Sequence, residues 1–94
     1  MPVHYGGFPC DMDGLGALVG DAGLILIEDA AHAPGASFRG RRLGSIGAVG
    51  CFSFFSNKNM TTGEGGMVTT RRPELAERLG WLLSHGMTAH PLDR

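Results

Sequence analysis

The chain of 94 residues is poor in charged residues and aromatic residues, and it contains one lysine. Charged residues make up 18% of it, against the roughly 25% that is usual for soluble domains. The 8 basic and 9 acidic residues nearly cancel, so nothing in the charge favours binding to nucleic acid or to an anionic membrane surface. No apolar run approaches the roughly 20 residues of a membrane-spanning helix. We therefore expect a soluble globular chain with no nucleic-acid or membrane partner.

Cysteine is also scarce. Cys10 and Cys51 lie far apart and form no C-x-x-C pair, and no basic start followed by an apolar signal segment opens the chain. Two free thiols in a reducing compartment are the simplest interpretation, so we expect a cytoplasmic location. A chain of this length removes only about 60 to 65% of its unfolded surface from water on folding, which predicts a small core.

The first half of the chain predicts a strand end, a helix and a buried strand. Residues 3–7 are typical of a strand running into a loop. Apolar residues recur at helical spacing from Asp11 to Ala22, with Asp11 or Asp13 as the N-cap and Gly23 as the end. The continuous apolar run of residues 24–27 predicts a strand buried on both faces of a parallel sheet and ending at Glu28.

The second half predicts a hairpin, two strands and a helix. Residues 37–44 favour a short hairpin around Gly40. Residues 49–55 and 66–70 are strand candidates, and an apolar stripe from Pro73 to Ser84 predicts a helix with proline in its first turn. Residues 85–94 show no periodicity. The alternation of strands and helices along the chain predicts an α/β fold with a layered sheet. Both ends of the chain look cut through an element, which indicates a piece of a larger domain.

Polar side chains stand where two of these strands are expected to end. Glu28, Asp29 and His32 follow the first strand, and Ser53 and Lys58 lie at and after the end of the second. In open α/β sheets, ligands bind beyond the carboxyl ends of the strands. An acid can hold a proton on a cationic nitrogen, an amine can form an imine, and hydroxyl groups suit a phosphate. Together these are the requirements of pyridoxal 5'-phosphate (PLP).

Each of these residues also has a plainer interpretation. Asp29 can cap the following turn, His32 can be a hydrogen-bonded structural histidine, Ser53 can bond a neighbouring backbone group, and Lys58 can be a solvated surface amine. Glu64 can be an ordinary turn acid. These interpretations would be the default if the residues were scattered, but they occur in an ordered series.

That series is Ile27-Glu28-Asp29-Ala30-Ala31-His32-Ala33, then Gly35-Ala36, Arg39-Gly40 and Leu43-Gly44, then Cys51-Phe52-Ser53-Phe54 with Lys58-Asn59, then Gly63-Glu64-Gly65-Gly66. It closely resembles the DegT/StrS-type nucleotide-sugar aminotransferase family, and the resemblance covers nearly the whole chain. Each motif by itself is weak, but all of them in order at the right separations are specific. The resemblance implies that the chain is a fragment of the large domain of PLP fold type I, with a mostly parallel sheet and flanking helices.

The resemblance also implies roles for four residues. Asp29 corresponds to the acid that pairs with the pyridinium nitrogen, and His32 to the residue that packs on the cofactor ring. Ser53 corresponds to the serine that binds the PLP phosphate, and Lys58 to the catalytic lysine that binds the cofactor aldehyde. Glutamate is the common amino donor in such enzymes, and a keto sugar on a nucleotide is the acceptor. Relatives with histidine in place of this lysine are sugar dehydratases, so Lys58 favours the aminotransferase branch.

The family's members are about four times longer and work as homodimers. We therefore interpret residues 1–94 as the central cofactor-binding part of the large domain, and expect the N-terminal segment and the C-terminal small domain to be absent. An inactive fragment or a non-catalytic PLP-binding remnant is the alternative.

Other classes of site have weaker support. The spacing of Gly14, Gly16 and Gly20 is not that of a dinucleotide-binding loop. A metal site built from His4, Cys10, Asp11 and Asp13 has no recognised ligand spacing. Arg41 and Arg42 offer cations for a sugar-nucleotide phosphate, although a solvated hairpin is the better interpretation.

Overall fold

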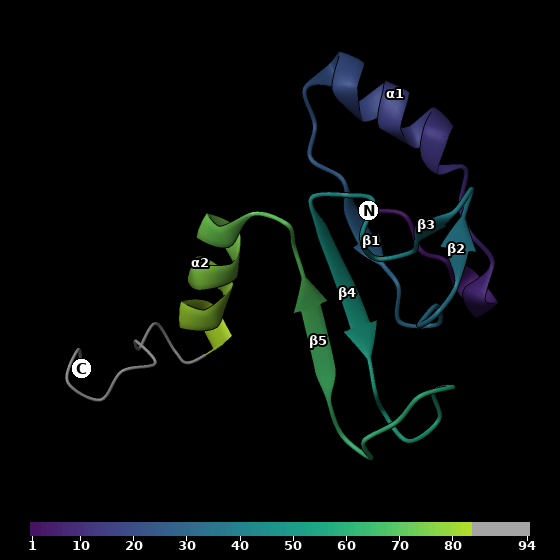
Figure 1. Cartoon of the computed structure of the whole chain (residues 1–94), viewed down its shortest axis with the longest axis vertical. Coiled ribbons are helices and arrows are strands. Elements are labelled where there is room, and N and C mark those ends of the chain that lie inside the picture. The colour runs from purple at the N-terminus through teal and green to yellow at the C-terminus, as the bar shows by residue number, and fades with distance from the viewer. Residues whose placement is uncertain (84–94) are drawn as a thin grey trace.

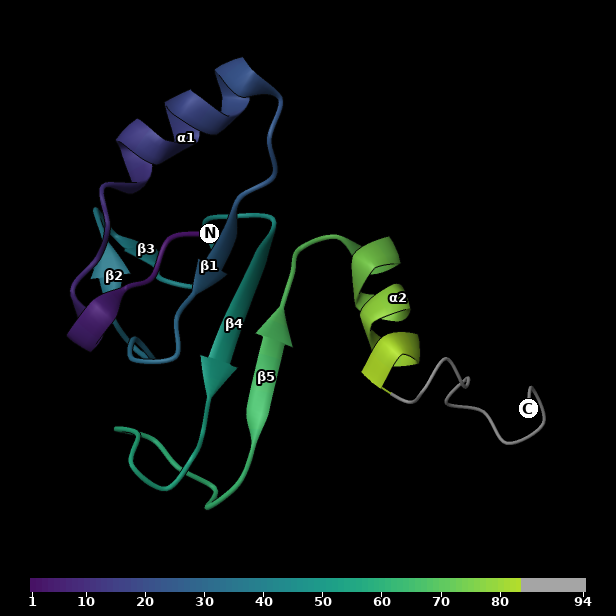
Figure 2. The ribbon, with the colours of Figure 1, turned by 180° about the vertical axis from the view of Figure 1, so that it is seen from behind.

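The computed structural model describes residues 1–83 of the chain. Its elements, in chain order, are the 3-10 helix η1 (Tyr5–Gly7), helix α1 (Met12–Ala22), strand β1 (Ile27–Asp29), strand β2 (Ser37–Phe38), strand β3 (Arg41–Arg42), strand β4 (Val49–Ser53), strand β5 (Gly66–Thr69) and helix α2 (Pro73–Leu83). Figures 1 and 2 show α2 beyond β5, with α1 on the other side of the molecule near β1 and the small β2–β3 pair. The α/β class expected from the sequence is confirmed.

The main sheet has three strands in the order β1-β4-β5. β1 and β4 are parallel, with Asp29 opposite Cys51, and β5 returns antiparallel to β4, with Cys51 opposite Val68. Val3 adds an isolated parallel bridge to Asp29, which agrees with a strand end in this segment. Because β1 and β4 run the same way, their carboxyl ends lie at one edge of the sheet (Figure 1).

Helix α1 has the predicted boundaries. The Asp11 side chain caps it by accepting a hydrogen bond from the Gly14 amide at 3.1 Å. Gly23 ends it in the left-handed conformation, with φ of 66°, and the Leu24 amide donates to the Val19 carbonyl at 2.8 Å. A left-handed glycine, followed by an amide that donates back to a carbonyl in the last turn, is a common end of an α-helix.

The strand predicted for residues 24–27 is wrong in position and in burial. β1 begins at Ile27, and the Leu24 amide donates to the last turn of α1 instead of to a neighbouring strand. Leu24 and Ile25 are 64% and 69% exposed, so this run is not buried on both faces. Glu28 and Asp29 belong to the strand rather than following it.

The later elements agree more closely with the sequence. β2 and β3 form the predicted hairpin, and its turn residues Arg39 and Gly40 both have positive φ. β4 ends at Ser53, two residues earlier than predicted, because Phe55 makes only an isolated bridge to Gly63. α2 begins at Pro73 as predicted, while the predicted end at Ser84 and the tail 85–94 lie outside the described residues.

The core lies between the loop after β1, the hairpin and β4. Its buried residues are Ala30, Ala33 and Leu43, and the residues packed on them are Ala36, Phe38, Ile46 and Phe52. Two glycines allow this close packing. A Cβ at Gly50 would overlap the Gly44 carbonyl, and a Cβ at Gly47 would lie 2.6 Å from the Leu26 carbonyl oxygen. The backbone segments that cross here can therefore approach only where a side chain is missing.

Both cysteines are free thiols, as the sequence indicates. Among residues 1–83, neither helix has the length and apolar character needed to cross a bilayer.

Candidate cofactor site

The candidate site lies at the edge of the sheet where β1 and β4 end. Asp29 is the last residue of β1 and Ser53 is the last residue of β4. The parallel ladder pairs Asp29 with Cys51, and the Ala30 amide donates to the Cys51 carbonyl at 2.8 Å. Ser53 is therefore two residues further along its strand than the partner of Asp29. The predicted acid and the predicted phosphate-binding hydroxyl thus belong to neighbouring strands at one edge.

Asp29 is held through its main chain and keeps part of its carboxylate free. Its amide donates to the Pro2 carbonyl at 2.9 Å, and its carbonyl accepts from the His4 amide at 3.1 Å. Oδ1 accepts a hydrogen bond from the Ala31 amide at 3.1 Å, which is the turn-capping contact of the plainer interpretation. Within the described residues this is the side chain's one hydrogen bond, so Oδ2 has the capacity to accept another from a ligand.

His32 has a fixed ring at the exposed side of the loop after β1. Its Nδ1 accepts a hydrogen bond from the Gly6 amide at 3.0 Å, and the Tyr5 ring meets it edge-on with centroids 5.3 Å apart. Because Nδ1 accepts, the proton of the neutral imidazole is on Nε2. The ring is thus oriented by the segment before α1 while the residue itself remains exposed.

Ser53 and Lys58 are placed by the turn that follows β4. Ser53 Oγ accepts from the Phe55 amide at 3.3 Å, which leaves its hydroxyl proton available to a ligand. The Lys58 amide donates to the Phe55 carbonyl at 3.0 Å, and the Lys58 residue is half-buried. In the described part of the chain, no carboxylate forms an ion pair with its amine.

The loop that carries the lysine is tied to the loop that carries the histidine. Asn59 Nδ2 donates to the Pro34 carbonyl at 3.4 Å, two residues after His32. The same loop is also tied to the residue after β4, because the Thr62 amide and the Thr61 hydroxyl both donate to the Phe54 carbonyl at 2.9 Å. These contacts bring the segments containing the four predicted residues to one region of the sheet edge.

The residue types fit a PLP molecule. The site offers a carboxylate oxygen for a protonated ring nitrogen, a flat ring to pack on, a hydroxyl donor for a phosphate, and an amine for an aldehyde. A sheet edge beyond parallel strands is also where α/β proteins bind ligands.

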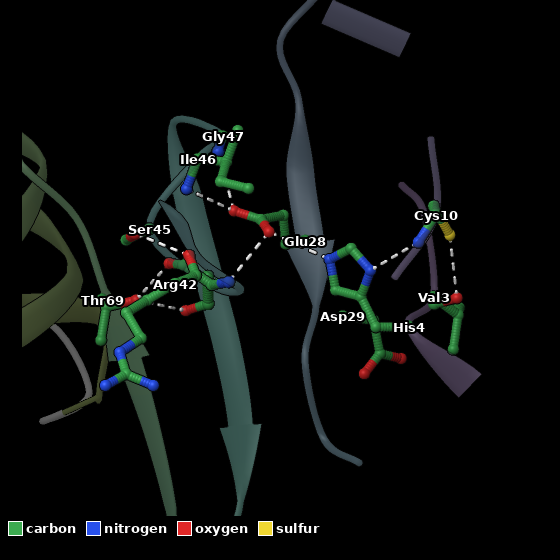
Figure 3. A network of polar contacts seen from close by, with 12 residues as sticks. Val3, His4, Cys10, Glu28, Asp29, Arg42, Ser45, Ile46, Gly47 and Thr69 are labelled. Atoms are coloured by element: carbon green, nitrogen blue, oxygen red, sulfur yellow. Dashed lines mark hydrogen bonds and ion pairs between the residues drawn. The ribbon is translucent and has the colours of Figure 1, made fainter. Parts of the chain in front are cut away.

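A second polar cluster, around Glu28, was misplaced by the sequence analysis. The residues of a strand point alternately to its two faces, so Glu28 projects away from the face of Asp29 rather than joining the candidate site. The Glu28 side chain is completely buried, as is that of His4. Figure 3 shows Glu28 between the His4 ring and the loop before β4. The alternation of side chains along a strand could have shown that Glu28 and Asp29 face opposite ways. It was not applied to these two residues because the predicted strand ended before them.

Four donors surround the Glu28 carboxylate. Oε1 accepts from His4 Nε2 at 3.0 Å and from the Gly44 amide at 2.8 Å, and Oε2 accepts from the amides of Ile46 at 2.8 Å and Gly47 at 2.7 Å. Burial by itself raises the pKa of the Glu28 carboxyl, but these hydrogen bonds outweigh burial and hold the pKa below its usual value. Glu28 is therefore a buried carboxylate whose lone pairs are satisfied by the protein.

Comparison with known proteins identifies the family. The model of the DegT/DnrJ/EryC1/StrS aminotransferase family matches residues 1–94. The chain belongs to this family. It is 49% identical to the spore coat polysaccharide biosynthesis protein SpsC of Bacillus subtilis over the whole chain, and 49% identical to GDP-perosamine synthase of Caulobacter vibrioides over 93% of the chain.

The fold of this DegT-family chain is also that of solved relatives. The aminotransferase from Psychrobacter cryohalolentis superposes with a TM-score of 0.88 and 48% identity, covering 93% of this chain and 22% of that one. SpsC and GDP-perosamine synthase are likewise each matched over 24% of their length. The chain thus spans about a quarter of the relatives it matches. A putative sugar aminotransferase from Streptococcus pneumoniae, solved in its PLP form, also superposes, with a TM-score of 0.85 and 31% identity over 96% of this chain and 28% of that one.

Proposed function

We propose that residues 1–94 are the central cofactor-binding part of the large domain of a PLP-dependent aminotransferase. The enzyme transfers an amino group from a donor, with glutamate the preferred candidate, to a keto sugar carried on a nucleotide, in amino-sugar or polysaccharide biosynthesis. The observation that carries the proposal is the placement of Asp29 and Ser53 at the ends of adjacent parallel strands, with Lys58 in the turn that follows.

The four side chains divide the work. PLP, when bound, would supply an electron sink for the amino transfer. Asp29 Oδ2 holds a proton on the ring nitrogen, and the His32 ring packs on the face of the pyridine. The Ser53 hydroxyl donates to the phosphate. Lys58 Nζ would hold the cofactor through its aldehyde group and would act as the base that takes up and returns a proton during the amino transfer.

The sugar, the location and the assembly are parts of the same proposal. The names of SpsC and GDP-perosamine synthase support a sugar product. Two free thiols are consistent with a reducing cytoplasm, and the family resemblance supports a homodimer.

The single lysine makes a direct test possible. The protein is incubated with PLP and reduced with borohydride, and the pyridoxyl group is then located by peptide mass spectrometry. We expect saturable labelling at Lys58 at PLP concentrations that leave the Met1 amine, which is on an 80% exposed residue, largely unlabelled. The Lys58→Arg variant keeps the positive charge and should show no saturable site. Equal labelling of the two amines in the unmodified protein would refute the proposal.

A second pair of variants tests the phosphate contact. Ser53→Ala removes the hydroxyl donor, and a hydrogen bond to a charged group is worth roughly 1.5 to 3 kcal/mol. We therefore expect the PLP concentration for half-labelling of Lys58 to rise at least about tenfold. Ser37→Ala, at an exposed serine in β2, is the matched control and should leave that concentration unchanged.

A further inference from the structure

We propose that Glu28 and His4 form a positioning pair that fixes Asp29 and His32 at the cofactor site. This inference rests on the function proposed above, because it assigns the pair a purpose through those two residues. Neither member of the pair faces the cofactor.

The Glu28 carboxylate joins two segments that are distant in the sequence. On one side it binds the loop before β4 through the amides of Gly44, Ile46 and Gly47, and on the other it binds the His4 ring (Figure 3). Both segments flank the strand that carries Asp29. A buried carboxylate tolerates little movement of its donors, since each donor that withdraws leaves a lone pair unsatisfied in the interior.

The His4 ring extends this connection to the segment before α1. Its Nδ1 accepts from the Cys10 amide at 3.2 Å, so its Nε2 carries the proton donated to Glu28. The ring is therefore neutral and uses both nitrogens. It joins β1 to both ends of the segment from residue 4 to residue 10.

The backbone around His4 contacts both predicted cofactor residues. The His4 amide donates to the Asp29 carbonyl, and the Asp29 amide donates to the Pro2 carbonyl. Two residues beyond His4, the Gly6 amide donates to His32 Nδ1. A continuous path of hydrogen bonds and backbone thus runs from the Glu28 carboxylate through His4 to the ring of His32.

This arrangement predicts a selective effect of removing the charge. In Glu28→Gln, the amide that replaces one carboxylate oxygen is itself a donor and faces backbone or imidazole donors. The His4 ring then loses its fixed position, and the Gly6 amide loses its alignment with His32. A loss of global stability alone would speed hydrogen exchange by the same factor at all amides that exchange through global unfolding. A loss of positioning would speed exchange most at the Gly6 amide, which binds His32.

The test follows the Gly6 amide and the His32 ring in the protein without cofactor. Amide hydrogen exchange is recorded for Gly6 and for Phe54, whose amide donates to the Gly65 carbonyl, and the tautomer of His32 is read from its ring nitrogen shifts. In Glu28→Gln we expect Gly6 exchange to rise at least about tenfold more than Phe54 exchange, with loss of the fixed His32 tautomer. The matched control, Glu77→Gln, changes an exposed acid in α2 and should alter neither.

A second pair of variants keeps the test decisive if Glu28→Gln does not fold. His4→Ala removes the ring and should speed hydrogen exchange at the Gly6 amide. His4→Gln can still donate a hydrogen bond to Glu28 and should restore much of the protection of the Gly6 amide. Either of two results would overturn the positioning role. The first is equal acceleration of amide exchange at Gly6 and Phe54 in Glu28→Gln. The second is equal acceleration at these two amides in His4→Ala, with no difference between His4→Ala and His4→Gln.

Cofactor labelling separates the two proposals. If Lys58 is labelled saturably but Gly6 and His32 do not respond, the positioning role is wrong and the proposed function stands. If Gly6 and His32 respond but Lys58 is not labelled selectively, the proposed function is wrong, and the pair is overturned as a device for holding cofactor residues.

Discussion

Two neighbouring carboxylates in β1 illustrate how position decides the role of a residue. Glu28 is buried and accepts four hydrogen bonds, whereas Asp29 is half-buried and accepts one at its side chain. Both are acids at the end of an apolar run, and composition does not distinguish them. The alternation of side chains along a strand sends them to opposite faces, one to the interior and one toward the candidate site.

The hydrogen bonds to the buried Glu28 carboxylate make the stability of the protein depend on pH. Its pKa is lowered in the folded protein, so it stabilises the fold fully above the usual glutamate pKa of 4.5. The stabilisation decreases as the pH falls through 4.5 and is lost below the lowered folded-state value. We expect Glu28→Gln to lower the free energy of unfolding by roughly 3 kcal/mol at pH 7, and by progressively less in acid.

Urea unfolding at a series of pH values measures this difference. Asp13→Asn, at an acid whose ion pair with Arg39 is exposed on both sides, provides the comparison and should have only a small effect. A Glu28→Gln deficit that is constant down to the most acidic pH would show that the charge of Glu28 has no part in the effect.

At the level of the elements, glycines have opposite effects according to their surroundings. In β4, a Cβ at Gly50 would overlap the backbone of Gly44, which lies in the loop that binds Glu28. In α1, a Cβ at Gly16 meets no atom within 4 Å. The first glycine is required by packing, and the second only costs the helix conformational entropy.

This contrast gives a paired prediction. Gly50→Ala should destabilise the protein by roughly 3 kcal/mol, because the strand and the loop must separate to admit the methyl group. Gly16→Ala should stabilise it by about 1 kcal/mol through the higher helix propensity of alanine. Thermal unfolding of both variants beside the unmodified chain measures the signs, and a stable Gly50→Ala variant would contradict the packing described here.

For the molecule as a whole, α2 is only loosely integrated with the sheet and the core. It has no buried residue, and Trp81, Leu82 and Leu83 are 45%, 68% and 77% exposed. Figures 1 and 2 show it beyond β5, at the edge of the sheet. An element with few buried contacts opens at a lower free energy than the core.

Hydrogen exchange of the intact chain tests this difference. We expect the amides of α2 to exchange at least about ten times faster than the paired amides of β4, because they can open without disturbing the core. Equal protection of α2 and β4 would mean that the chain unfolds as one cooperative unit.

Much of the candidate site was predictable from the sequence. Asp29 and Ser53 end adjacent strands, and His32 and Lys58 lie in the segments that come after them. The turn signals placed the hairpin, the end of α1 and the start of α2 correctly. Leu24 and Ile25 were misjudged because local apolar character does not show that the Leu24 amide is used to end α1. Glu28 was misjudged for a related reason, since the strand starts and ends later than the apolar run.

The sequence by itself determined the α/β class, the helix caps and the family, since these depend on spacing along the chain and on residue types in a fixed order. Only the tertiary structure decided which of two adjacent acids is buried, and which backbone segment holds the His32 ring. Those outcomes depend on strand register and on contacts between residues 16 to 26 positions apart. No local pattern encodes such contacts, because they exist only when the segments meet in the fold.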